Sequence, residues 1–214
     1  MRIDIISDVV CPWCFIGKRR LEKALALRPE IAADITWRPF QLNPDMPEDG
    51  MLRAEYIASK FGDSGHSRRI HQTIAEAGAT VGIDFAFDRI RRSPNTRNAH
   101  RLIRFATQRG RGGAVVDLLF RGYFLEGRDV GDEATLAGIA AAAGLDRDEA
   151  AAFLAGTEAR DEIIAEDRNA RRLGINAVPC FIFAGQYAVS GAQEPEFFLP
   201  VFDLAQNNTA AAAK

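Results

Sequence analysis

The sequence is poor in the features that mark secreted, membrane and nucleic-acid-binding proteins. It contains three cysteines in 214 residues, too few for the disulfide framework of a small secreted protein. No stretch approaches the ~20 uncharged apolar residues of a membrane span, and Asp4 interrupts the first apolar run, unlike a secretory signal. The 27 basic and 29 acidic side chains give a net charge of −2, so the charge balance indicates neither a nucleic-acid nor a membrane partner. The sequence therefore predicts a cytoplasmic protein and leaves its oligomeric state open.

Two of the three cysteines lie close together near the start of the chain, in Cys11-Pro12-Trp13-Cys14. The short apolar run Ile3–Ile6 before them is typical of a strand buried on both faces. The residues after them, Phe15–Leu27, are good helix formers, and Ile35–Phe40 alternates like a second strand that ends near its proline. Together these segments predict a βαβ unit in which the cysteine pair lies between the first strand and the helix.

The position of the cysteine pair at a helix start suits redox chemistry. Pro12 fits the first helical position and makes Cys11 the cap, where free amides and the helix dipole favour a thiolate. Cys14 lies three residues on, on the same side of the first turn, so it could resolve a mixed disulfide formed on Cys11. Zinc would need further ligands, but Cys180 is alone and no histidine has matching spacing. We expect no metal site, and the alternative to a redox pair is two inert buried thiols.

The middle of the chain is predicted to be helical, and its end returns to strands. Ile83–Phe87 is the one window there that looks like a strand, and Ser93-Pro94 gives the clearest helix start. Val178–Val189 predicts a β-hairpin, and the final helix carries Pro200, which predicts a kink or an early break. The predicted helices cover Leu52–Phe61, Ser67–Ala77, Pro94–Arg109, Ala114–Glu126, Glu133–Ala143, Arg147–Leu154, Glu158–Leu173 and Glu194–Gln206. The helix that ends near Leu173 has the clearest stop, at Gly174.

Four stretches match one known pattern: Ser7–Cys14, Pro39–Pro44, Gly174–Pro179 and Tyr187–Gln193. With the order of the elements, they make the chain resemble the thioredoxin superfamily, and within it the DsbA-like proteins, especially the FrnE-like members. The resemblance implies an α/β fold, a thioredoxin-like mixed sheet with a large all-helical insertion. We expect residues 1–44 and 161–214 to form the two parts of the thioredoxin-like domain and residues 45–160 to form the insertion.

The resemblance also implies a thiol-disulfide oxidoreductase that exchanges disulfides through Cys11 and Cys14. The redox group would be the disulfide between these two residues, with no tightly bound cofactor. The partners would be thiol or disulfide proteins, or glutathione as co-substrate. Pro179 would be a cis-proline facing the cysteine pair, and Val178 would offer its backbone to an extended substrate. The residues expected to bind substrate are Pro12, Trp13, Asn43, Val178, Pro179, Ser190 and Gly191.

The last two of these residues open the final helix, where glutathione-binding relatives place a carboxylate. Ordinary helix capping explains Ser190 and Gly191 equally well. An alternative function is a glutathione-dependent isomerase or transferase, which resembles 2-hydroxychromene-2-carboxylate isomerase and the kappa-class glutathione transferases. Those enzymes have the same fold but typically carry a serine in the place of Cys11 and lack the second cysteine.

The chain departs from the family pattern at two positions. Many relatives have an acid six residues before the first cysteine, which takes the proton of the second thiol. This chain has Ile5 there, with Asp4 and Asp8 nearby, so the resemblance identifies no proton acceptor for Cys14. Cys180 follows Pro179 where relatives have a hydroxyl or an aromatic group, and we interpret it as a packing residue, with an auxiliary redox thiol as the alternative.

Overall fold

A mixed β-sheet forms the centre of the fold in the computed structural model, which describes residues 1–62 and 64–212. The strand order is β2-β1-β5-β6; β1 runs parallel to β2 and antiparallel to β5, and β5 pairs antiparallel with β6. The strands are β1 (Arg2–Ser7), β2 (Asp34–Pro39), β5 (Cys180–Phe183) and β6 (Tyr187–Ser190). Because β1 pairs with both β2 and β5, the N-terminal βαβ unit and the C-terminal hairpin share one sheet, as the fold class predicts.

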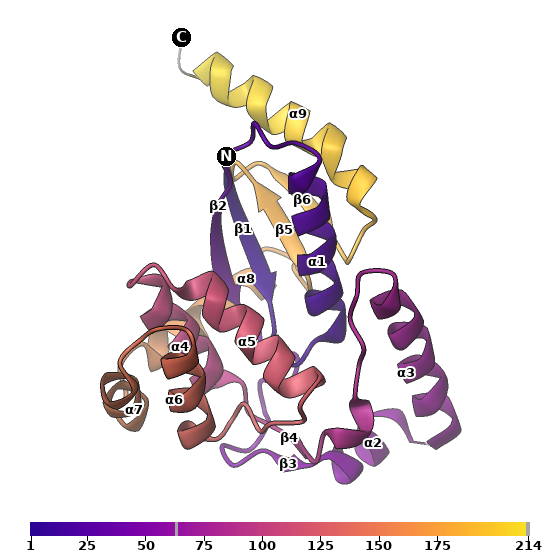
Figure 1. The fold of residues 1–214 in the computed structure, drawn as a ribbon, viewed down its shortest axis with the longest axis vertical. Helices are drawn as coiled ribbons and strands as arrows, with labels where there is room; N and C mark the ends of the chain where they lie inside the picture. The colour runs from indigo at the N-terminus through magenta and orange to yellow at the C-terminus, as the bar shows by residue number, and fades with distance from the viewer. Residues whose placement is uncertain (63, 213–214) are drawn as a thin grey trace.

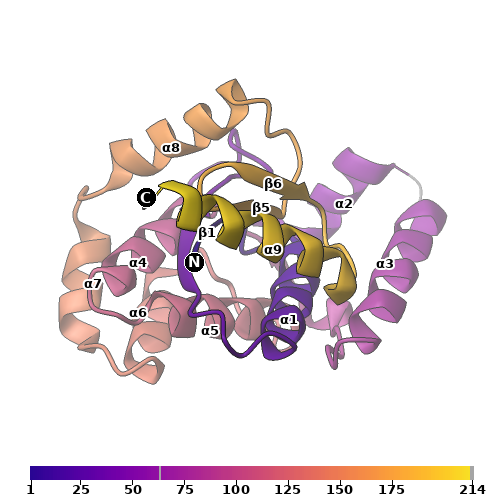
Figure 2. The same cartoon turned by 90° about the horizontal axis from the view of Figure 1, so that it is seen from above.

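Helices cover both faces of this sheet. Helices α1 (Pro12–Ala26) and α9 (Pro195–Ala212) pack on one face, and α8 (Arg160–Arg172) lies on the other (Figures 1 and 2). Ile3 and Ile5 of β1 face the core under α1 and α9, whereas Ile6 joins the core on the insertion side. Alternate residues of a strand point to opposite faces, so this short apolar strand is buried on both.

The segment between β2 and α8 forms the insertion, which lies against the end of the sheet at which β1 stops (Figure 1). Its elements are β3 (Met51–Leu52), α2 (Arg53–Phe61), α3 (Ser64–Ala79), η1 (Phe87–Arg89), β4 (Arg92–Ser93), α4 (Arg97–Thr107), α5 (Gly112–Phe124), α6 (Glu133–Ala142) and α7 (Arg147–Ala155). Phe15 of α1 stacks on Phe120 of α5 with ring centroids 5.1 Å apart. The insertion therefore packs against one side of α1, the helix that carries the cysteine pair. Helix α9 packs against another side of α1.

The predicted helix start at Ser93-Pro94 is wrong. Ser93 pairs with Met51 in the short β3–β4 ladder, and α4 begins only at Arg97. Between them the Asn95 side chain accepts a hydrogen bond from the Arg97 amide at 3.0 Å and donates one to the Met46 carbonyl at 2.7 Å. Pairing with a segment some forty residues earlier thus keeps Ser93 and Pro94 out of the helix.

The strand-like window Ile83–Phe87 is also not a strand. It is a loop that leads into η1, and its alternating aromatic residues serve a different purpose. Phe85 and Phe87 stack on each other with centroids 4.9 Å apart, and Phe85 packs edge-on against Phe124. The alternation reflects two rings that enter one aromatic cluster rather than a pleated backbone.

The two predicted helix ends have opposite outcomes. The stop of α8 is confirmed, because Ile175 N–H donates to the Ala170 carbonyl and Gly174, with φ of 81°, donates to Arg171. The break predicted at Pro200 does not occur, since α9 continues to Ala212. Pro200 is exposed, so the carbonyl that loses its donor there can face water.

Candidate functional site

The cysteine pair begins α1 directly after a tight turn from β1. The Asp8 carbonyl accepts a hydrogen bond from the Cys11 amide at 3.0 Å, which closes the turn. Cys11 is the N-cap with extended backbone angles, and Pro12 occupies the first helical turn, as expected from the sequence. The Cys11 side chain makes no capping hydrogen bond to the helix amides, so the sulfur is directed elsewhere.

The Cys11 sulfur faces the segment that precedes β5. Its thiol donates to the Val178 carbonyl oxygen at 3.6 Å, although 167 residues separate the two. The Val178–Pro179 peptide bond is cis. Pro179 packs against α1 at Gly17, where an added Cβ would lie 2.8 Å from the Pro179 Cγ atom. These contacts bring the two segments that the resemblance singled out into one site.

Cys14 lies deeper than Cys11 and is surrounded by polar groups of the preceding turn. Burial raises the pKa of the Cys14 thiol well above its ordinary value, and the neighbouring Cys11 sulfur raises it further. Hydrogen bonds from the Ser7 hydroxyl and the Asp8 amide act in the opposite direction. Cys14 therefore holds its proton while Cys11 is the thiol beside the Val178 carbonyl.

All three cysteines are free thiols in this structure, so the pair is a dithiol and not the disulfide expected as the redox group. Cys11 is 4% exposed and Cys180 is 5% exposed. Cys180 of β5 pairs with Ile6 of β1 and belongs to the core on the insertion side. Burial raises the pKa of Cys180, which keeps it a protonated packing residue. Within residues 1–62 and 64–212 no group of three potential metal ligands occurs.

The expected substrate-binding residues differ in how deeply they are buried. Pro12 and Trp13 are half-buried, whereas Val178 and Pro179 are buried. The Asn43 side chain is turned toward α2, where it accepts hydrogen bonds from Tyr56 at 3.2 Å and Lys60 at 2.9 Å. The Asn43 side chain is thus hydrogen-bonded to α2 and not directed at the cysteines.

Ser190 is the last residue of β6 and Gly191 begins the turn that follows, so the expectation that they open the final helix is wrong, because α9 starts only at Pro195. Gly191, with φ of 81°, donates its amide to the Pro179 carbonyl at 2.8 Å, so the turn is attached to the segment beside the cysteines. Arg20 of α1, which the sequence did not single out, is buried and donates to the Ala192 carbonyl at 2.5 Å. The turn is therefore fixed between β5 and α1.

Two further buried polar groups lie near the cysteines and were not predicted as site residues. Asp8 is fully buried and accepts a hydrogen bond from the Leu42 amide at 2.7 Å. His100 of α4 is 4% exposed, and its Nε2 atom lies 3.5 Å from Asp8 Oδ1. Asp8 lies close to the cysteines in the sequence, but no sequence pattern indicated that it would contact His100 of the insertion.

Membrane insertion by a helix is not indicated: within the described ranges, none of the helices has the length and apolar character that crossing a bilayer requires.

Comparison with known proteins gives one consistent result. The family model of the DSBA-like thioredoxin domain matches residues 2–202. A probable DsbA oxidoreductase from Streptomyces coelicolor is 34% identical and superposes with a TM-score of 0.87, over 97% of this chain and 90% of that chain. YwbO, an uncharacterized protein of Bacillus subtilis, is 26% identical over 92% of this chain and 94% of its own length.

More distant solved structures share the fold. A 2-hydroxychromene-2-carboxylate isomerase is 17% identical with a TM-score of 0.70, over 100% of this chain and 98% of that chain. The cytosolic disulfide reductase DsbM from Pseudomonas aeruginosa is 16% identical with a TM-score of 0.65 over the same shares, and it has also been solved with glutathione. The family match spans nearly the whole chain, and the protein therefore belongs to the DSBA-like thioredoxin-domain family.

Proposed function

We propose that the protein is a thiol-disulfide oxidoreductase that exchanges disulfides through Cys11 and Cys14. The observation that carries this proposal is the arrangement of two free thiols at the start of α1, with the Cys11 sulfur 3.6 Å from the Val178 carbonyl oxygen. The thiolate of a cysteine is the form that attacks a disulfide. Cys14, whose pKa is raised by burial, stays a thiol until the mixed disulfide has formed.

The exchange would take place in two steps. The Cys11 thiolate attacks a substrate disulfide, forms a mixed disulfide and releases one substrate thiol. Cys14 then loses its proton and attacks the Cys11 sulfur, which releases the second thiol and leaves the Cys11–Cys14 disulfide. The substrate gains two electrons and the pair loses them, and the reverse sequence oxidises a dithiol substrate.

The substrate would approach across the rim formed by Pro12 and Trp13 and lie along the backbone of Val178. Backbone pairing of this kind accepts many extended peptides, because it reads the main chain rather than the side chains. Ser190 and Gly191 lie beyond Pro179 and would contact the end of a bound peptide or the carboxylate of glutathione. We propose thiol or disulfide proteins, or glutathione, as partners and a cytoplasmic location, as for the DsbM neighbour that is named a cytosolic disulfide reductase.

A trapping experiment tests this function. Replacing Cys14 with Ser prevents resolution, so proteins held on Cys11 by a mixed disulfide can be isolated and identified. The matched control is Cys180→Ser, which leaves the pair intact and should trap nothing. The proposal requires that wild-type protein reduce a model protein disulfide such as insulin, and that Cys11→Ser abolish this activity. If Cys11→Ser retained the activity, the proposal would be wrong.

A glutathione-dependent isomerase or transferase is the second candidate. It is favoured by the fold shared with 2-hydroxychromene-2-carboxylate isomerase over the full chain. In that function glutathione is activated without a change in redox state, so Cys14 would be dispensable. Turnover of a hydroxychromene carboxylate by wild type and Cys14→Ser alike, with glutathione alone trapped on Cys11, would favour this candidate over disulfide exchange.

A further inference from the structure

The second step of the exchange requires a base for Cys14, and the position used by many relatives offers none. Ile5 stands six residues before Cys11, is 1% exposed and packs into the apolar core under α1 and α9. Burial and the Cys11 sulfur both raise the pKa of the Cys14 thiol. A group elsewhere must therefore take up the proton if resolution is to be fast at neutral pH.

The polar route away from Cys14 begins at Ser7. The Ser7 hydroxyl acts on the Cys14 thiol and lowers its pKa against the larger effect of burial, and Ser7, 5% exposed, also lines a cavity of about 200 Å³ beside β2. A cavity of this size holds several waters, each of which occupies ~30 Å³ in the liquid. Ser7 thus connects the sulfur to a space that water can occupy.

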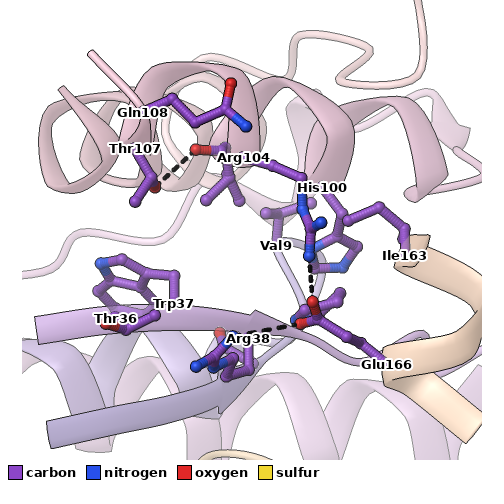
Figure 3. A pocket seen from close by; sticks show the side chains of 13 residues that line it. Val9, Thr36, Trp37, Arg38, His100, Arg104, Thr107, Gln108, Ile163 and Glu166 are labelled. Carbon is purple, nitrogen blue, oxygen red and sulfur yellow. Dashed lines mark hydrogen bonds and ion pairs between the residues drawn. The ribbon is translucent and has the colours of Figure 1, made fainter. Parts of the chain in front are cut away.

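His100 lines the same cavity from α4 (Figure 3). Its Nε2 atom lies 3.2 Å from the Phe40 carbonyl oxygen and 3.5 Å from Asp8 Oδ1. Both neighbours are acceptors, so the neutral ring is assigned with its hydrogen on Nε2, and Nδ1 is left as the basic nitrogen. Histidine is also the side chain that most readily gains and loses a proton near neutral pH.

Asp8 is placed to stabilise a positive charge on this ring. Its side chain is fully buried, and its Oδ2 atom is occupied by the Leu42 amide at 2.7 Å. Its Oδ1 atom, which faces His100, has no hydrogen-bond partner among the described residues. A buried carboxylate with one such oxygen gains most from a neighbour that becomes an imidazolium.

We propose that His100 accepts the proton of Cys14 by way of Ser7 and water in the cavity, and that Asp8 stabilises the imidazolium that forms. This inference rests on the proposed disulfide exchange. In the resolving step the Ser7 hydroxyl turns its hydrogen toward the cavity, so that its oxygen accepts the Cys14 proton while its own proton passes through water to His100. The Cys14 thiolate then attacks Cys11, and the bond between Cys11 and the substrate sulfur breaks. In the reverse direction the same groups return the proton to Cys14.

Other charged groups surround the cavity but are paired with one another. Arg104 of α4 and Arg38 of β2 both contact Glu166 of α8 (Figure 3). Arg38 also contacts Asp4, and Arg104 also contacts Glu162. Burial raises the pKa of Tyr123 of α5 to about 12, and the negative Asp8 adds to that rise, so the phenol stays neutral. Asp8 is thus the negative charge beside His100, whereas Arg104, four residues further along α4, is a cation paired with two carboxylates.

The test follows the resolving step with Ellman's reagent, a small chromogenic disulfide, in a Cys180→Ala background. Attack by Cys11 releases the first equivalent of coloured thiol, and resolution by Cys14 releases the second. In His100→Gln we expect the rate of the second release to fall by about 100-fold at neutral pH. As the pH is raised, this rate should increase in proportion to the hydroxide concentration. The rate of the first release should stay within about twofold of the parent, because the proposed route serves Cys14 and takes no part in the attack by Cys11.

Three more variants separate proton transfer from structural damage. Ser7→Ala should slow the second release like His100→Gln while preserving the buried ring, and Asp8→Asn should slow it by about tenfold. Asp167→Asn is the matched control. Asp167 is also buried, and it accepts a hydrogen bond at 2.8 Å from the Gln41 amide, which neighbours the Leu42 amide that donates to Asp8. Asp167→Asn should lower stability but leave the pH profile of the second release unchanged.

The outcomes distinguish the two proposals. Second release at the parental rate and pH dependence in both His100→Gln and Ser7→Ala would overturn the proton route and leave the exchange function intact. If the parent itself released a single equivalent, or if Cys14→Ser released the second as fast as the parent, the exchange function would fail instead. Slowing in Asp167→Asn equal to that in His100→Gln, with the same hydroxide dependence, would also contradict the route.

Discussion

Adding one methyl group at Gly17 should disturb the contact between α1 and Pro179. An alanine Cβ at this position would lie 2.8 Å from Pro179 Cγ and 3.1 Å from Phe181 Cζ, well inside the ~3.5–4.0 Å of favourable carbon contacts. Both neighbours are rings in a buried strand segment, so neither can turn away as the end of a flexible side chain could. The substitution must therefore shift α1 or the Pro179 segment.

The magnitude follows from two opposing contributions. Overpacking of a core typically costs about 1–3 kcal/mol, whereas replacing glycine by alanine inside a helix gains about 1 kcal/mol. Gly17→Ala should therefore lower the free energy of unfolding by roughly 0–2 kcal/mol. Gly138 in α6 is the matched control, because an added Cβ meets nothing within 4 Å there, and Gly138→Ala should raise stability by about 1 kcal/mol.

Urea denaturation of the two variants and the parent measures the difference, which should be about 1–3 kcal/mol. A shift of Pro179 also moves the Val178 carbonyl away from Cys11, so Gly17→Ala should slow the first release from Ellman's reagent by about tenfold. If Gly17→Ala proved as stabilising as Gly138→Ala and reacted at the parental rate, the reasoning that Pro179 packs tightly on α1 would be refuted.

Substitutions at three further positions test two buried groups and one helix cap. Tyr123, with its pKa raised to about 12 in the folded protein, ionises first in the unfolded chain, so stability falls as pH rises above the ordinary value of ~10. Between about pH 8 and pH 11 the parent should lose about 1.4 kcal/mol more than Tyr123→Phe; equal losses in urea melts at the two pH values would contradict the assignment. Asp146 accepts hydrogen bonds from the Asp148 and Glu149 amides at 2.9 and 2.8 Å, so Asp146→Ala should cost about 1 kcal/mol in urea denaturation, and Asp146→Ser should restore most of it. Cys180→Ala should keep insulin reduction at the parental rate and lose about 1 kcal/mol of stability through lost packing; loss of the activity in a folded variant would instead give this thiol a redox role.

The sequence alone determined the features that depend on neighbouring residues. The helices of the insertion, the stop of α8 and the placement of the cysteine pair at a strand–helix junction follow from periodicity, capping residues and proline positions. The same local rules failed at Ser93 and at Phe85, where partners distant in the chain decided the backbone. Family resemblance, and not periodicity, indicated that Val178 and Pro179 would meet the cysteines.

The tertiary structure decided everything that depends on contacts between distant residues. Cys11 and Val178 are 167 residues apart, and Asp8 meets His100 from a different part of the chain. No local pattern records such pairs, because a buried carboxylate or imidazole has the same sequence neighbours whether or not it finds a partner. The sequence therefore placed two thiols at a helix start, and folding around them determined which carbonyl faces one thiol and which groups surround the other.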